Sequence, residues 1–421
     1  MRAFQVLNAL AERYDVSLLT RGDLNSQKLE GQQARTRDAC RSVTILPAGG
    51  RRLGALWRRG LRRVYPNAYY AIYRQPSDWC FISAADRQVL ARAYADEKFD
   101  LIHLHRLYML PILSNIPAHL SCVPAQIDMD DVESRTRERL ARLAKLNGDI
   151  RLARLMAHDA ELYRSLEIHQ LSRFVRAFVC ATGDRQLLSS KINKPPIVVI
   201  PNTVAIPQTR SSSEYRASSS FIFLFVGSIG YYPNLDAVAF FCREIAPVLR
   251  RRATIPFEIR AVASGRTRQW SKVPQIPELV RCDPSEYGLA AEYAKADAVV
   301  APIRAGGGTR IKILEAFAHK RPVVATSIGA EGLGVRADEH ILIADTAEAF
   351  AAQCLRLMQD FRLRGDISER AFELVSTYHG SEALRQCFDA GEGHEDEEPT
   401  KSCTRNVGAC RDEAPVTSTG H

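Results

Sequence analysis

Residues 306–316 read GGGTRIKILEA and follow a short apolar segment, AVVAPI, at residues 298–303. The apolar segment is typical of a buried strand, and the apolar spacing after the glycines predicts a helix that begins near Ile311. Arg310 and Lys312 place two cations in the first turn of this helix, although the helix macrodipole favours negative charge there. An anionic ligand such as a phosphate would remove the conflict, because free N–H groups, the dipole and the cations would all attract it. A solvated, charged helix end explains the local sequence equally well.

The sequence that follows favours the ligand. A Lys-Arg-Pro triplet at residues 320–322 ends the helix, VVAT at 323–326 predicts a second buried strand, and GAEG at 329–332 predicts a second glycine turn. Strand, glycine loop, helix, strand and loop together form one α/β unit. Its polar loops lie at the carboxyl ends of parallel strands, where open α/β sheets bind ligands.

This unit resembles part of a known enzyme family. Residues 300–332 are similar to the donor site of the retaining glycosyltransferases of family 4, which have the GT-B fold. A second block agrees: FVGS at 225–228, followed by YPNLDA at 232–237, resembles the first strand and helix of the donor domain in a bacterial, polysaccharide-associated branch. A third block, VIPNTV at 199–204, resembles the strand before the interdomain linker. The resemblance runs in order to about residue 385.

The resemblance implies an α/β protein with two doubly wound Rossmann-like domains that face a cleft. The length agrees, since 421 residues are too many for one hydrophobic core. Alternating strand-like and helix-like segments predict a parallel sheet in the first half as well, where residues 133–173 read as one long helical stretch. The expected parts are an N-terminal acceptor-side domain at 1–206, a linker at 207–220, a nucleotide-sugar donor domain at 221–375, a helix at 376–390 that returns toward the first domain, and a disordered tail at 391–421.

The start of the sequence departs from the family pattern. Residues 3–12 predict an amphipathic helix and residues 16–20 predict a strand, whereas the family begins with a strand and a glycine-rich loop. We therefore expect the first domain to lack its first strand and part of its acceptor site.

Composition narrows the class of protein. The ten cysteines show neither a CxxC motif nor Cys/His ligand spacing, which argues against a zinc site and a disulfide framework and favours reduced thiols. No segment has the length of uncharged apolar sequence that crosses a bilayer, and the first residues do not read as a signal peptide. The net charge of +9 is compatible with nucleic acid, but no nucleic-acid motif accompanies it. We expect a cytoplasmic protein that binds no nucleic acid.

One basic segment predicts a membrane contact. Residues 51–64 carry six arginines among apolar residues without one acidic residue, and four tyrosines follow by residue 73. Such a segment can bind the surface of an anionic membrane, which would suit an acceptor on a lipid carrier. An ordinary helix with a solvated arginine face explains the pattern about as well, so both interpretations stay open.

The resemblance implies roles for individual residues on the donor side. Arg310 and Lys312 would stabilise the charge that grows on the departing phosphate, and Glu315 matches a glutamate that binds the ribose hydroxyls of the donor. The family pattern has a second glutamate at the position of Gly307, so this carboxylate is missing here. Ser228 stands where many relatives carry an arginine. The expected donor-binding set is Gly227, Ser228, Asn234, Gly307, Gly308, Thr309 and Glu315.

On the acceptor side, polar residues end two strands of the first domain. His103 and His105 fall on one side of a strand and could bind a metal, but no third ligand is near, so ordinary histidines are the simpler interpretation. Asp128 and Asp130 follow on the next strand and invite comparison with the Asp-x-Asp metal motif of another glycosyltransferase fold. The GT-B resemblance argues against a metal. It implies instead that this strand end lies beside the acceptor and that Asp128 falls where some relatives carry a functional histidine, so we assign Asp128 to the catalytic set and the other three residues to the acceptor side. No cofactor and no metal are expected. The nucleotide-diphosphate sugar is the donor substrate.

Two functions are consistent with the sequence. The first is a retaining glycosyltransferase of hexosyltransferase type, which moves a sugar from a nucleotide-diphosphate sugar to a glycan or lipid-linked acceptor in the biosynthesis of a cell-surface polysaccharide. The second is a catalytically inactive GT-B-like scaffold or partner of polysaccharide assembly, which the missing glutamate and the missing first strand favour.

Overall fold

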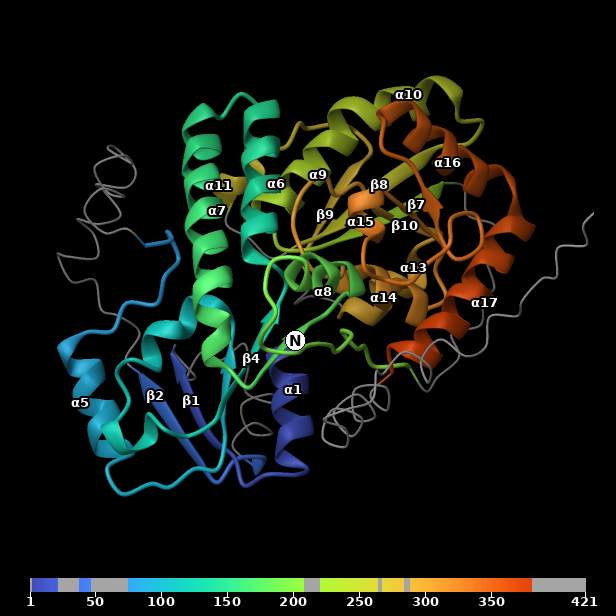
Figure 1. Ribbon diagram of the computed structural model, residues 1–421. Coiled ribbons are helices and arrows are strands. Elements are labelled where there is room, and N and C mark those ends of the chain that lie inside the picture. Colours follow the sequence, from blue (N-terminus) through green and yellow to red (C-terminus); the bar gives the residue numbers. More distant parts are fainter. Residues whose placement is uncertain are drawn as a thin grey trace, which may run out of the picture.

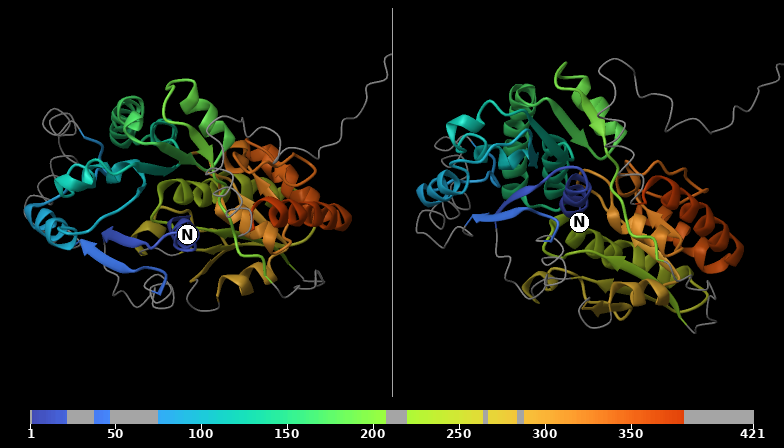
Figure 2. Two further views of the ribbon diagram at one scale, coloured as in Figure 1. Left: turned by 60° about the horizontal axis from the view of Figure 1, so that its bottom comes forward. Right: turned by 90° about the horizontal axis from the view of Figure 1, so that it is seen from below.

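The computed structural model describes residues 2–21, 38–46, 75–207, 220–263, 267–283 and 288–380. The chain forms two halves that lie side by side, each built around parallel strands (Figure 1). Figure 2 shows the same division from two further directions, with the blue-to-green half beside the yellow-to-red half. The basic segment at 51–73, linker positions 208–219 and the tail from 391 lie outside the described residues.

The C-terminal half holds a six-stranded sheet in which neighbouring strands are parallel. Both faces of the sheet are buried, and the central strand β7 accordingly reads FIFLFV. The order across the sheet is β12 (Leu342–Ile343), β11 (Val323–Ala325), β10 (Ala298–Ala301), β7 (Phe221–Val226), β8 (Phe257–Val262) and β9 (Leu279–Cys282). Since β10 and β7 are neighbours, the loops at their carboxyl ends lie close together.

Helices flank this sheet. The helix predicted after the glycine loop is α14 (Ile311–Ala318), and α17 (Phe361–Tyr378) covers the side away from the N-terminal half (Figure 1). Because α17 continues to Tyr378, the expectation of a separate helix from residue 376 was wrong in its start, and residues from 381 lie outside the described ranges. The other helices of this half are α9 (Tyr232–Phe240), a π-helix (Phe241–Ile245), α10 (Ala246–Arg252), α11 (Thr267–Trp270), α13 (Leu289–Lys295), α15 (Ser327–Ala330) and α16 (Ala347–Gln359).

The N-terminal half holds two smaller parallel sheets. In the first, β1 (Ser17–Arg21) pairs with β2 (Ser42–Leu46). The second has the order β3 (Ile102–His105), β4 (Ala125–Asp130), β5 (Arg176–Val179) and β6 (Ile197–Val199). Within the described ranges no strand joins the two sheets. The proposed loss of a first strand stays a prediction.

Short helices complete this half. α1 (Arg2–Ala11) packs Val6 and Leu10 against Phe178 of β5 and against Ile200, so the amphipathic helix predicted from the sequence covers the sheet through its apolar side. The other short elements are α5 (Ala84–Ala93), α8 (Thr182–Ser189) and 3₁₀ helices at Leu107–Ile112, Ala118–Leu120 and Leu171–Arg173.

The long helical stretch expected at 133–173 is two antiparallel helices. α6 (Glu133–Leu146) and α7 (Ile150–Gln170) are joined by a tight turn at Asn147-Gly148-Asp149. Gly148 has a φ of 76°, and the Asp149 side chain accepts a hydrogen bond from the Leu152 N–H at 3.0 Å, which caps α7. The helical stretch is confirmed, whereas its division into two helices, which these turn residues cause, was not predicted. α6 stands between α7 and the C-terminal half (Figure 1).

The chain crosses between the halves near Asn202, which contacts three separate elements. Its Oδ1 accepts a hydrogen bond from Arg2 at 3.1 Å, and its Nδ2 donates to Oγ1 of Thr309 at 2.7 Å. Its carbonyl lies 2.8 Å from Nδ1 of His379, which is the C-cap residue of α17. The crossing is therefore fixed to α1, to the glycine loop and to the end of the last helix.

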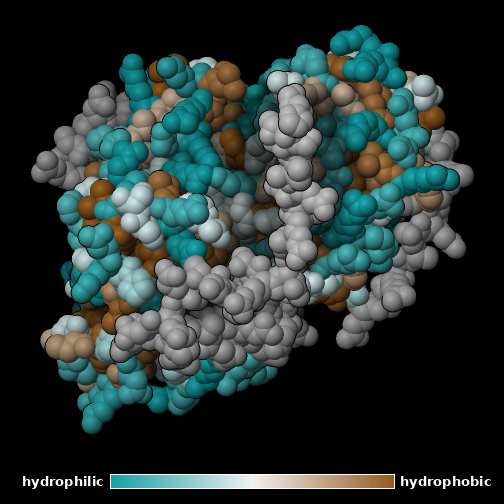
Figure 3. Space-filling view, turned by 45° about the vertical axis from the view of Figure 1, so that its right-hand side comes forward, coloured by the Kyte–Doolittle hydropathy of each residue, from teal (hydrophilic) through white to brown (hydrophobic). Residues whose placement is uncertain are grey.

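The face shown in Figure 3 carries mostly hydrophilic side chains with smaller apolar areas between them, which is ordinary for a surface in contact with water. None of the described helices combines the length and the apolar character that crossing a membrane requires. Each cysteine in the described residues has a free thiol.

Candidate functional site

The glycine loop leads from β10 into α14 at the carboxyl edge of the six-stranded sheet. Gly306 and Gly308 have φ values of 121° and 64°, a backbone region that other residues rarely adopt. Arg310 is the N-cap residue of α14 and Lys312 lies in its first turn, so the two cations flank a helix N-terminus as the sequence predicted. No acidic residue lies in this first turn.

Lys312 connects the glycine loop to the end of β7. Its Nζ donates to Oδ1 of Asn234 at 2.7 Å and lies 4.3 Å from the centre of the Phe225 ring. A Cβ on Gly227 would lie 2.8 Å from Nζ and 2.8 Å from Nδ2 of Asn234, so a side chain there would displace both groups. Burial, together with the nearby Arg310 guanidinium, lowers the pKa of Lys312 to about 7.

Arg310 is the least satisfied cation of the site. Its Nη1 donates to the carbonyls of Gly307 and Gly308, the second at 2.9 Å. Its Nε and Nη2 are buried and have no hydrogen-bond partner among the described residues. Burial lowers the pKa of this guanidinium. A buried charge that lacks partners is costly, and an anionic ligand would satisfy both donor atoms.

Asn234 and Ser228 form the opposite wall. Nδ2 of Asn234 donates to the Ser228 carbonyl at 3.0 Å, which fixes the loop after β7 onto the start of α9. The Ser228 hydroxyl accepts a hydrogen bond from the Gly230 N–H at 3.3 Å. The structure thus brings Gly227, Ser228, Asn234 and Lys312 together as the sequence predicted, although they come from two distant segments.

Glu315 lies one turn further along α14. It accepts a hydrogen bond from the Tyr293 hydroxyl at 3.1 Å, and the Tyr293 ring stacks on His319 with centroids 4.7 Å apart. Burial raises the pKa of the Glu315 carboxyl. Tyr293 could not be predicted from the sequence, because it stands in α13 (Leu289–Lys295), outside both motif blocks. The ribose-binding role of Glu315 stays a prediction.

In the N-terminal half, Arg2 contacts Asp128, which the sequence assigned to the catalytic set. The Arg2 guanidinium contacts both carboxylate oxygens of Asp128 at 2.9 Å, and the two residues are 4% and 1% exposed. Burial alone would raise the pKa of Asp128, but Arg2 outweighs it and the pKa is lowered. This contact holds α1 against β4. The catalytic role of Asp128 stays a prediction, and the contact that the structure shows is a structural one.

The other acceptor-side residues surround this ion pair. Nδ1 of His105 lies 3.4 Å from Asp128, and Oδ2 of Asp130 pairs with Arg106 at 2.8 Å. His103 points elsewhere: its Nδ1 lies 3.0 Å from Nε2 of Gln126, and burial lowers its pKa to about 4. His103 and His105 therefore do not form a pair around a common ligand. Among the described side chains, no group of three or more His, Cys, Asp or Glu is placed to hold a metal ion.

The two halves contact each other directly along α6. Arg139 donates to the Gly306 carbonyl at 3.0 Å and pairs with Glu331, which also pairs with Arg135. At the other end of the helix, Nδ2 of Asn147 donates to Asp236 at 2.6 Å. No sequence pattern predicted these contacts, because they join residues that are far apart along the chain.

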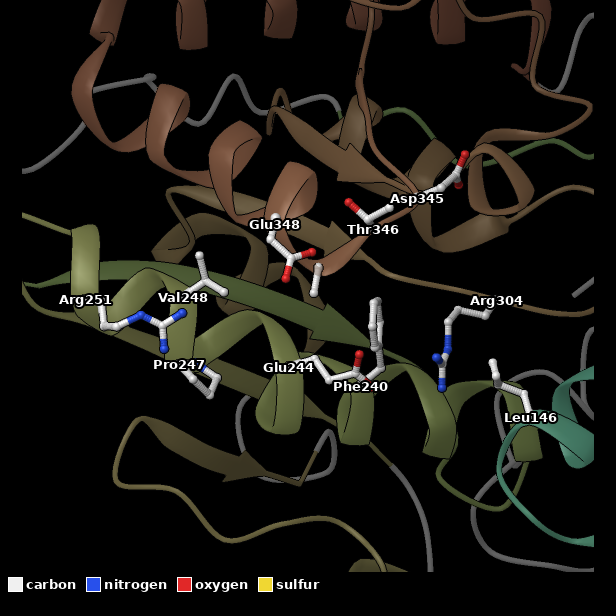
Figure 4. Close-up of a pocket in the computed structure, with 11 residues that line it drawn as sticks. Leu146, Phe240, Glu244, Pro247, Val248, Arg251, Arg304, Asp345, Thr346 and Glu348 are labelled. Carbon is white, nitrogen blue, oxygen red and sulfur yellow. The ribbon is translucent and has the colours of Figure 1, made fainter.

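A separate cavity of about 530 Å³ lies between the segment from the end of α9 to α10 and the start of α16. Figure 4 shows Arg304 beside the Phe240 ring at one end of it, with Glu244 next to them and Glu348 on the facing helix. Arg304 is paired with Asp236 at 2.7 Å, so its charge is neutralised within the protein. This cavity holds none of the residues that the sequence assigned to the donor site.

Comparisons of sequence agree with the donor-side motifs. Residues 220–360 match the model of the family described as Glycosyl transferases group 1. An uncharacterized 44.6 kDa protein in the cps region of Klebsiella pneumoniae is 26% identical over 167 residues, which cover 38% of this chain and 43% of that protein. The matched part thus spans less than half of the length of this curated relative. Part of the C-terminal half, residues 220–360, is therefore similar to this family.

Comparisons of structure extend the likeness to both halves. Sucrose-phosphate synthase from Thermosynechococcus elongatus has a TM-score of 0.60 at 15% identity, over 92% of this chain and 90% of that one. Anabaena HepE in complex with UDP and glucose gives 0.56 at 12% identity, over 92% and 94%. S. aureus TarM in complex with fondaparinux, alpha-GlcNAc-glycerol and UDP gives 0.53 at 13% identity, over 72% of this chain and 58% of that one. These likenesses confirm the predicted fold, two Rossmann-like domains of the GT-B type.

Proposed function

We propose that this protein is a retaining glycosyltransferase that moves a sugar from a nucleotide-diphosphate sugar to a glycan or lipid-linked acceptor during synthesis of a cell-surface polysaccharide. The family model matched at residues 220–360 supports transfer of a glycosyl group. The cps-region relative supports a place in polysaccharide synthesis. Retention rests on the resemblance of residues 300–332 to family 4.

The observation that carries this proposal is the pair of cations at the start of α14. Arg310 offers two buried donor atoms that lack partners in the described residues, and Lys312 lies beside it on the same helix N-terminus. A nucleoside diphosphate would supply the negative charge that this arrangement favours. During transfer, negative charge grows on the departing phosphate, and fixed cations in a buried site stabilise it most effectively.

Two departures from the family pattern support a second candidate, an inactive GT-B-like scaffold of polysaccharide assembly. Gly307 removes a carboxylate from the donor loop, and Ser228 removes a cation from the opposite loop. A scaffold could retain the nucleotide site without turnover. Binding and turnover must therefore be measured separately.

The test begins with titration of the protein with UDP and GDP by isothermal calorimetry. We expect one of the two to bind, and Arg310→Ala to weaken the binding. A panel of nucleotide sugars is then tested for binding. Product analysis with a labelled donor tests transfer, and NMR assignment of the new anomeric centre tests retention. Failure of both nucleotides to bind would refute the enzyme and the nucleotide-binding scaffold alike, whereas binding without transfer would leave the scaffold.

Peripheral contact with an anionic membrane is part of the same proposal. It rests on the sequence of residues 51–73, since this segment lies outside the described residues. Each basic residue near an anionic surface contributes about 1 kcal/mol. Co-sedimentation with phosphatidylglycerol vesicles at low salt, lost at high salt, is the expected result, and equal binding to neutral vesicles would contradict it.

A further inference from the structure

The glycine loop of the donor domain faces a carboxylate of the other domain. The loop at 306–310 contains no acidic residue of its own, because glycine stands at position 307. A Cβ on Gly307 would overlap Oγ1 of Thr136 and lie 2.5 Å from Oδ2 of Asp131. The space that a side chain at 307 would fill is thus taken by two polar groups at the start of α6.

Asp131 is held in position by its own domain. Arg106 pairs with Oδ1, and the Thr136 hydroxyl donates to Oδ2 at 2.8 Å. A carboxylate has about four acceptor positions, so each oxygen retains capacity for a further hydrogen bond. The residue is 7% exposed, and a hydrogen bond to a charged group formed away from water is strong.

The other side of the loop points to a ligand independently. Nε and Nη2 of Arg310 are buried without a partner in the described part of the chain. A Cβ on Gly306 would lie 3.1 Å from Nη2 of Arg310 and 3.3 Å from the Tyr231 hydroxyl. Cationic donors therefore lie on one side of the loop and a carboxylate acceptor on the other. A nucleotide-diphosphate sugar has the matching groups, since its phosphates are anionic and its sugar hydroxyls donate hydrogen bonds.

We propose that Asp131 binds hydroxyl groups of the donor sugar, so that the N-terminal domain supplies the carboxylate that position 307 lacks. This inference rests on the proposed function and adds the group that recognises the sugar. Thr136 orients the carboxylate. The nucleotide would be bound by the C-terminal domain alone, whereas the sugar would be recognised only where both domains meet.

The test compares each nucleotide with its sugar conjugate. Dissociation constants for UDP, UDP-glucose, GDP and GDP-mannose are measured by calorimetry on the full chain and on Asp131→Asn, which keeps the size of the side chain and removes its charge. We expect the nucleotide to bind Asp131→Asn as it binds the wild type, while the additional affinity that the sugar provides falls about tenfold or more. Glu138→Gln is the matched control, because Glu138 is an exposed acid of α6 that pairs with Arg142.

A second variant keeps the test decisive if Asp131→Asn does not fold. Thr136→Val removes the hydroxyl that orients Asp131, and a smaller loss confined to the sugar conjugate is expected. Loss of affinity for nucleotide and conjugate alike, or an unchanged ratio between them, would overturn the role of Asp131 and leave the proposed function standing. A wild type that binds neither nucleotide would overturn the proposed function, and this inference with it.

Discussion

The low pKa of Lys312 makes nucleotide affinity depend on pH in a way that can be calculated. Burial and Arg310 lower the pKa of this amine from 10.5 to about 7, so above pH 7 the free protein increasingly holds a neutral lysine. A diphosphate favours the cation, and binding must then return a proton to Nζ. Affinity for UDP should therefore fall as the pH rises above about 7, by about tenfold per pH unit or about 1.4 kcal/mol.

Between pH 7 and 9 the expected loss is about 50-fold, since the cationic fraction of Lys312 falls from about one half to about one hundredth. The terminal phosphate of the ligand contributes little over this range, because its pKa is about 6 and it is already ionised. Calorimetry at pH 8 in buffers of different ionisation enthalpy should show uptake of nearly one proton for each UDP bound.

Lys312→Met should bind UDP weakly, without the pH slope and without proton uptake. Lys295→Met is the control, because Lys295 is a half-exposed lysine of the same domain that pairs with Glu292. An affinity that stays constant between about pH 7 and 9, or an equal slope in Lys312→Met, would show that this amine does not carry the pH dependence and would refute the reasoning.

Four further changes test other parts of the structure. Arg310→Ala should weaken UDP binding by about 1.5–3 kcal/mol in calorimetry, the worth of a hydrogen bond to a charged group, and unchanged affinity would remove it from the phosphate site. Glu315→Ala should weaken binding of UDP but not of pyrophosphate, whereas equal losses would contradict its ribose role. Arg2→Met should lower the free energy of unfolding in urea by about 3–5 kcal/mol because it leaves a buried carboxylate unpaired, and a loss below about 1 kcal/mol would disprove a structural pair. Gly307→Ala should lower the melting temperature by forcing the domains apart, and Thr136→Ala added to it should restore part of the loss; no recovery would place the strain elsewhere.

Local sequence patterns were sufficient to predict the strands and helices around the glycine loop of the C-terminal half. Apolar runs and glycine turns alternate there at short spacing, so β10, the glycine loop, α14 and β11 fall where the sequence placed them. The hairpin of α6 and α7 was missed because its flanks are long and rich in helix-forming residues. The turn signal, Asn147-Gly148-Asp149, is only three residues long.

The residues of the candidate site could be predicted where they belong to a sequence motif. They could not be predicted where they come together only because the two halves pack against each other. Lys312 and Asn234 belong to two motif blocks, and the parallel order of β7 and β10 brings them together. Asp131 lies beside Gly307 only because α6 packs on the donor domain. Arg2 and Asp128 are separated by 126 positions, and no periodicity of the sequence connects them.

The three-way contact of Asn202 limits how such proteins can be recombined. A chimera cut within residues 208–219 would transfer Thr309 and His379 without Asn202. An incoming half that lacked both a hydroxyl at 309 and a ring nitrogen at 379 would leave Asn202 with Arg2 alone of these three partners. The crossover for exchange of sugar specificity should therefore be placed before residue 202, or the three residues should be moved as a set.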